Sequence, residues 1–66
     1  MKWTAWTNVK YLPAEVDVTS REELMDKIQK IADARPVLLR IEGFTDQVNV
    51  YRHEPSRWRH VATYMP

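Results

Sequence analysis

The segment from Ser20 to Ala34, SREELMDKIQKIADA, decides the fold class of this chain. Ser20 followed three residues later by Glu23 has the form of a capping box, in which the serine oxygen accepts a backbone hydrogen bond and the glutamate reaches back to the cap. Pro36 disfavours helical geometry at the residue before it. The apolar positions between these signals have helical spacing: Leu24, Ile28, Ile31 and Ala32. The segment therefore predicts a helix of about four turns that ends near Ala34 and packs one face on a sheet.

Before this helix, residues 2–11 alternate in the manner of a half-buried strand. The side chains expected to face the core are Trp3, Ala5, Thr7, Val9 and Tyr11. Trp6 falls on the opposite, polar face, where it is either local packing or an interface anchor. Pro13 should end, bend or bulge the strand, after which Val16 and Val18 resume the alternation. The pattern fits either one bulged strand or a short hairpin.

After the helix, the pattern predicts three strands joined as an antiparallel meander. The first covers residues 37–42, and we expect Gly43 to open a turn through Asp46. The second covers residues 47–53, with Val48 and Val50 inward. The third covers residues 58–65 and is apolar on both faces, so that two sets compete for the core: Trp58, Ala62 and Tyr64 against Val61 and Met65. The alternation alone does not decide between them.

These elements predict a single α+β domain over residues 1–66, in which one helix packs on a mainly antiparallel sheet of about four strands in the order β-α-β-β-β. A chain of 66 residues has a thin stability margin, and its three Trp, three Tyr and one Phe are the expected source of core area. One helix covers only one face of the sheet. The open face is expected to carry Trp6, Leu38, Arg40, Tyr51 and either Arg59 or Trp58, which would make it a contact surface.

Several classes of function are disfavoured by the composition. Without cysteine there is no disulfide framework and no thiolate zinc site. The sequence has no signal-peptide stretch and no apolar run of the roughly 20 residues that span a bilayer, so we expect a cytosolic protein without a membrane partner. Glycine-rich phosphate loops and nucleophile elbows are absent, which predicts a non-enzymatic protein without catalytic residues or cofactor. The spacing of His53, Glu54 and His60 matches no zinc motif, so we expect no metal site.

Charge is unevenly distributed although the net charge is only +1. Residues 14–34 carry six acids against three bases, whereas residues 47–66 carry three arginines and two histidines against Glu54. The basic cluster interleaves guanidinium groups with an indole, as phosphate contact and base stacking require: Arg52, Arg57, Trp58, Arg59 and His60. Alternatively, the arginines are solvated and Trp58 fills the core or stacks under one of them.

The spacing of several residues resembles small phage-encoded anti-CRISPR proteins that inhibit type I-F surveillance complexes. The elements that carry it are the helix opened by Ser20, Arg40-Ile41-Glu42, Tyr51-Arg52 and Arg57-Trp58, within residues 16–58. The N-terminal strand and the tail after Trp58 depart from the pattern. The resemblance implies a non-enzymatic inhibitor that docks on a Cas backbone subunit, with Lys30, Arg52 and Arg57 as the matched bases.

The leading hypothesis is therefore a phage or mobile-element protein that binds and inhibits a host protein complex in the bacterial cytoplasm. The residues predicted to bind the partner are Trp6, Lys30, Arg40, Tyr51, Arg52, Arg57, Trp58 and Arg59. Alternatives are a small single-stranded nucleic-acid-binding module, a toxin-immunity protein and a homodimer that buries its open sheet face.

Overall fold

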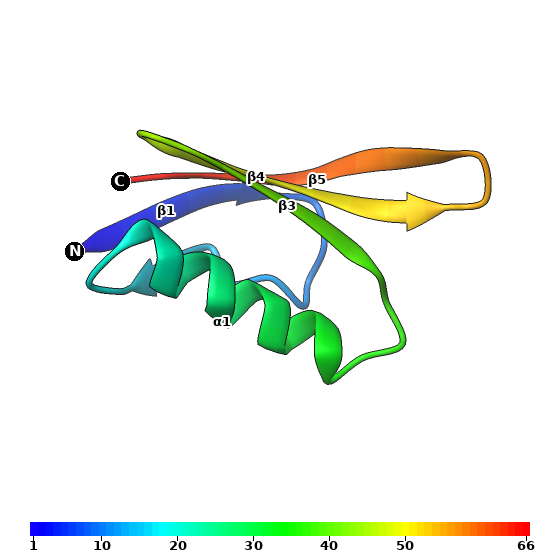
Figure 1. The fold of residues 1–66 in the computed structure, drawn as a ribbon, viewed down its shortest axis with the longest axis horizontal. Helices are drawn as coiled ribbons and strands as arrows, with labels where there is room; N and C mark the ends of the chain where they lie inside the picture. Colours follow the sequence, from blue (N-terminus) through cyan, green and yellow to red (C-terminus); the bar gives the residue numbers. More distant parts are fainter.

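The computed structural model describes residues 1–66 and contains one helix and five strands (Figure 1). In chain order these are β1 (Lys2–Thr7), β2 (Glu15–Asp17), α1 (Arg21–Asp33), β3 (Leu39–Phe44), β4 (Gln47–Glu54) and β5 (Arg57–Met65). All strand pairs are antiparallel, in the spatial order β2-β1-β5-β4-β3. The helix lies on one side of this sheet. The α+β class is confirmed, and the expected number of about four strands is one too few.

Helix α1 begins and ends where the sequence predicts. The Ser20 Oγ accepts a hydrogen bond from the Glu23 N–H at 3.1 Å, and the Glu23 carboxylate accepts from the Thr19 N–H at 2.8 Å. In a standard capping box the Glu23 side chain would accept from the N–H of the N-cap residue Ser20, but here it accepts from the N–H of Thr19, the residue before the cap. At the other end, the Ala34 N–H bonds to the Lys30 carbonyl at 3.1 Å.

We expect Ser20→Ala to lower the free energy of unfolding by about 1 kcal/mol, because the Glu23 N–H loses its acceptor. For a domain of this size that is a fall in Tm of roughly 4–8 °C, measurable by circular dichroism. Ser56→Ala, in the exposed turn between β4 and β5, is the matched control and should melt like the wild type. Equal melting of the two variants would contradict the role of the cap.

The N-terminal strand is shorter than predicted because local hydrogen bonds turn the chain after Thr7. The Thr7 hydroxyl is 3.2 Å from both the N and the O of Val9, and the Asn8 N–H donates to the Val61 carbonyl at 3.0 Å. Residues 15–17 then pair with β1, so the short hairpin is confirmed and a strand continuing to Tyr11 is wrong. This hairpin supplies the fifth strand.

Strand β3 lies two residues later than predicted, and Gly43 is inside it. The turn consists of Thr45 and Asp46 alone. The φ of Gly43 is not positive, so this position does not need glycine for its backbone conformation. A Cβ atom there would lie 2.6 Å from the Met25 Sδ, which means that the missing side chain allows α1 to approach β3 closely.

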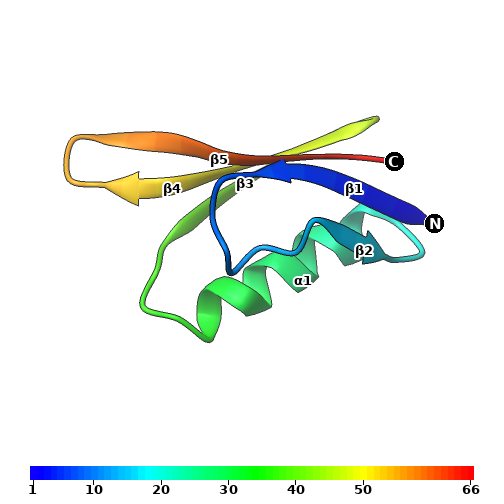
Figure 2. The ribbon, with the colours of Figure 1, turned by 180° about the vertical axis from the view of Figure 1, so that it is seen from behind.

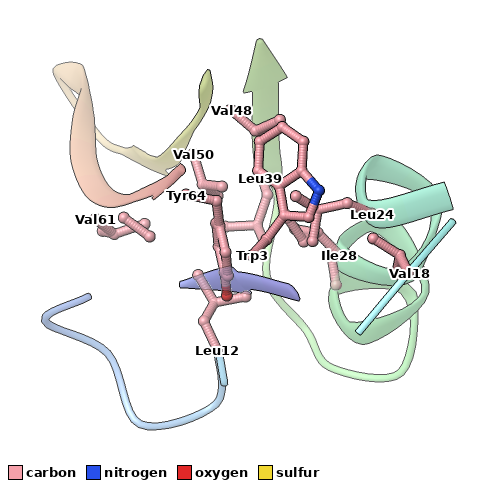
Figure 3. Packing of buried hydrophobic residues seen from close by; sticks show 12 residues of the cluster. Trp3, Leu12, Val18, Leu24, Ile28, Leu39, Val48, Val50, Val61 and Tyr64 are labelled. Carbon is pink, nitrogen blue, oxygen red and sulfur yellow. The ribbon is translucent and has the colours of Figure 1, made fainter. Parts of the chain in front are cut away.

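The core fills the space between α1 and the sheet. Twelve residues are buried, and all of them are apolar or aromatic: Trp3, Leu12, Val18, Leu24, Ile28, Ala32, Leu39, Val48, Val50, Val61, Ala62 and Tyr64. Figure 3 shows ten of them labelled between α1 and the strands. The helix runs beneath the sheet and connects β2 at one edge to β3 at the other (Figure 2). No helix of the chain has the length and apolar character that a membrane crossing requires.

Candidate binding surface

Strand pleating places a distinct set of side chains on the sheet face that α1 does not cover. Since Trp3, Val48, Val50 and Tyr64 point to the core, their neighbours along each strand point away from it. We call this surface the open face. It carries five of the six large apolar side chains that are exposed: Trp6 (58 %), Leu38 (59 %), Phe44 (51 %), Trp58 (39 %) and Met65 (50 %). An apolar concentration of this kind on one face is typical of a contact surface.

A β-bulge at Val61 decides which side chains of β5 reach the open face. Val50 of β4 is opposite Ala62, but the next residue, Tyr51, is opposite His60. Val61 is therefore an extra residue, and it is buried together with Ala62. The bulge resolves the competition for the core: Val61, Ala62 and Tyr64 are inside, and Trp58 is outside.

Aromatic rings are packed against one another on the open face, from its centre to the end of the β4–β5 hairpin. The Trp6 indole stacks on the His60 imidazole, with the ring centroids 5.5 Å apart and an interplanar angle of 9°. Tyr51 meets the same imidazole edge-on at 5.5 Å, and His53 meets Trp58 edge-on at 5.0 Å. Because each ring is held by a neighbour, these side chains have little rotamer freedom left to lose in a contact.

A short hydrogen-bonded chain fixes the imidazole under Trp6. The His60 Nε2 lies 2.6 Å from the Thr63 Oγ1, which donates to the Asn49 Oδ1 at 2.9 Å. The Gln47 amide donates to the same Asn49 oxygen at 2.9 Å. These contacts span β4 and β5, so the orientation of His60 follows from the strand register.

The open face also contains a hollow of about 230 Å³. It is lined by Arg40 and Glu42 from β3, Tyr51 from β4 and Trp58 from β5. The Arg40 guanidinium and the Glu42 carboxylate form an ion pair at 2.9 Å. The hollow thus combines two aromatic side chains with a neutralised pair of charges, a composition that suits an anchoring side chain of a protein partner.

Charged groups on the open face neutralise one another. Besides the Arg40 pair, Lys2 lies 3.7 Å from Glu15, and the N-terminal amine of Met1 lies 3.1 Å from Asp17. Three positive groups are therefore matched by three carboxylates. A surface without excess positive charge is unsuited to holding a phosphate backbone and better suited to protein.

The residues predicted to bind a partner divide into two groups. Trp6, Arg40, Tyr51 and Trp58 lie together on the open face, as does Leu38. Side-chain alternation places Arg52, Arg57 and Arg59 on the opposite side of the sheet. Of the two residues expected as alternatives on the open face, it is therefore Trp58 and not Arg59 that lies there. Lys30 lies on the exposed side of α1, paired with Asp26 at 3.1 Å.

Several residues of this surface are not among the predicted binding residues. Phe44 falls in the segment predicted to be a turn, and Met65 is among the side chains expected to compete for the core. Glu42, Asn49 and Thr63 resemble ordinary solvent-facing residues. For Glu42, Phe44 and Asn49 the signal that could have found them is their period-two spacing from Arg40 or Tyr51. The considered group of His53, Glu54 and His60 does not converge, since Glu54 points to the other side of the sheet. No cluster of three residues that could hold a metal ion occurs.

No family model matches the chain, and no curated protein and no solved structure is significantly similar to it.

Proposed function

We propose that this protein is a non-enzymatic binding protein that docks its open face on another protein. The observation that carries the proposal is the gathering of Trp6, Phe44, Trp58 and their neighbours on one face whose charges are balanced. Trp, Tyr and Arg dominate the energetics of protein interfaces, and the face presents all three around a hollow.

As the partner we propose a host protein complex, and specifically a type I CRISPR surveillance complex. This finer part rests on the resemblance of residues 16–58 to phage-encoded inhibitors. The bases implied by that resemblance, Lys30, Arg52 and Arg57, lie outside the open face, so contacts through them and contacts through the open face are separable by mutation.

The test is co-purification with a type I surveillance complex in the presence of nuclease, together with phage plaque formation on a host that carries the system. We expect the wild type to be retained and to restore plaques. Trp6→Ser and Phe44→Ser should each weaken binding by roughly 2 kcal/mol, or about 30-fold, as truncation of an interface anchor does.

The matched control is the pair Lys27→Ser and Asp33→Ser, two exposed changes on the far side of the molecule that should leave binding intact. An open-face variant that folds and binds like the wild type would refute docking through this face. Recovery that disappears on nuclease treatment would point instead to nucleic acid, and failure to restore plaques would reject the CRISPR partner.

A further inference from the structure

The β4–β5 hairpin extends beyond the rest of the molecule. Strand β5 runs from Arg57 to Met65, but β1 pairs only with residues 62–65 of it. The Asn8 N–H covers the carbonyl of Val61. Residues 57–60 therefore pair with β4 on one side and have no strand on the other. The hairpin tip lies past the end of α1 in both views (Figures 1 and 2). We call residues 57–60 the free edge.

The side of the hairpin that faces the helix layer is basic. Arg52 is directly opposite Arg59, and Glu54 is opposite Arg57. Glu54 is the only carboxylate among them, with its oxygens 2.7 Å from the Arg59 Nε and 3.5 Å from the Arg57 Nε. Arg52 has no ion-pair partner. Like charges directly opposite on neighbouring strands are destabilising, and here they leave a local excess of two positive charges.

The other side of the same hairpin is aromatic. Trp58 and His60 point to the open face, and Trp58 remains 39 % exposed beside His53. Along the free edge, guanidinium groups on one side consequently alternate with aromatic rings on the other. A ligand lying along this edge meets both kinds of side chain at once.

We propose that the free edge, together with Arg52, binds single-stranded nucleic acid. Phosphates would be held by Arg52, Arg57 and Arg59, and a base would stack on Trp58. The alternation favours this ligand over a run of acidic residues, whose carboxylates could pair with the arginines but which has no ring to stack on the indole. The three arginines lie on the opposite side of the sheet from the open face, and Trp58 is the one side chain that both proposals use. Variants of the arginines therefore test this site without changing the surface proposed to bind a protein.

The test is fluorescence anisotropy of a labelled oligo-dT of 12 nucleotides, titrated at several salt concentrations between 50 and 200 mM NaCl. Three phosphate contacts predict a slope of about −2 in log K against log salt, or roughly a 20-fold loss of affinity over this range. The pair Arg52→Ala and Arg59→Ala should reduce the slope to about −0.7. The pair Lys27→Ala and Lys30→Ala removes the same charge from α1 and should leave the slope unchanged.

Trp58→Leu separates stacking from charge. We expect it to weaken binding at least fivefold without changing the salt slope, a combination that a simple loss of charge does not produce.

The proposal is overturned if no binding is seen at about 100 μM protein in 50 mM NaCl, if the lysine pair lowers the slope as much as the arginine pair, or if a polyglutamate peptide competes as well as unlabelled oligo-dT. Circular dichroism confirms that each variant is folded.

Discussion

Trp3→Ala should unfold the protein, whereas Trp6→Ala should leave it folded. The two tryptophans are three residues apart on β1 and point to opposite sides of the sheet. Trp3 is 2 % exposed and belongs to the core, while Trp6 is 58 % exposed on the open face. Truncation of a buried tryptophan costs about 3–5 kcal/mol, which is about what the single core of so small a domain supplies.

Urea denaturation followed by far-UV circular dichroism measures both variants. We expect no cooperative transition for Trp3→Ala and, for Trp6→Ala, a midpoint close to that of the wild type. A Trp3→Ala variant that unfolds cooperatively with a loss below about 1 kcal/mol would show that Trp3 is not part of a tightly packed core.

Trp3→Phe refines this test. The Trp3 Nε1 is buried without a hydrogen-bond acceptor, so the indole carries a desolvation cost that a phenyl ring avoids. Phenylalanine keeps most of the apolar volume. The variant should therefore remain folded, and its loss of stability should be clearly smaller than that of Trp3→Ala.

Elements decided by local interactions were predictable from the sequence. The capping residues of α1 are three positions apart, and both act through backbone groups within one turn of the helix. The inward positions of β4, Val48 and Val50, follow from alternation within a single strand. In these cases the residues that determine the structure and those that adopt it are close together in the chain.

Features decided by distant residues were not predictable in the same way. The loop between β1 and β2 places Leu12 in the core, and the Tyr64 hydroxyl, which is 51 residues away, donates to the Pro13 carbonyl at 2.6 Å. Likewise, the bulge at Val61 reverses the facing of everything before it in β5. Two adjacent apolar residues, Val61 and Ala62, are consistent with a bulge but do not by themselves require one.

On the candidate surface, too, the residues whose facing depends on local alternation were predictable, and those that depend on the bulge were not. Trp6, Arg40 and Tyr51 were placed correctly because each lies in a regularly alternating strand. The members of the basic cluster are close together in the sequence, which predicts a single site, yet adjacent residues of a strand point to opposite sides of the sheet. Trp58 is thereby separated from Arg57 and Arg59, which turns one expected site into two surfaces on the two sides of a single hairpin.

Alkaline pH should destabilise the protein through Tyr64. This side chain is fully buried, and burial raises the pKa of Tyr64 to about 12 from its ordinary value of 10. Because the folded state holds the proton more tightly than the unfolded state, the stabilisation is fully present below pH 10 and is lost as the pH rises to about 12. The free energy of unfolding should fall by about 1.4 kcal/mol per pH unit in that window, or by about 3 kcal/mol in all.

Urea denaturation at a series of pH values from 8 to 12, with Tyr64→Phe beside the wild type, tests this assignment. The variant loses the hydrogen bond to the Pro13 carbonyl and should be about 1 kcal/mol less stable at neutral pH. Its free energy of unfolding should also decline much less steeply above pH 10, because phenylalanine has no proton to lose.

The control is Tyr51→Phe, a change at a half-buried position on the open face. It leaves Tyr64 in place, so its free energy of unfolding should decline as steeply as that of the wild type. If Tyr64→Phe declines as steeply as Tyr51→Phe, another group causes the alkaline unfolding, and the buried hydroxyl of Tyr64 is not the one that couples proton binding to this fold.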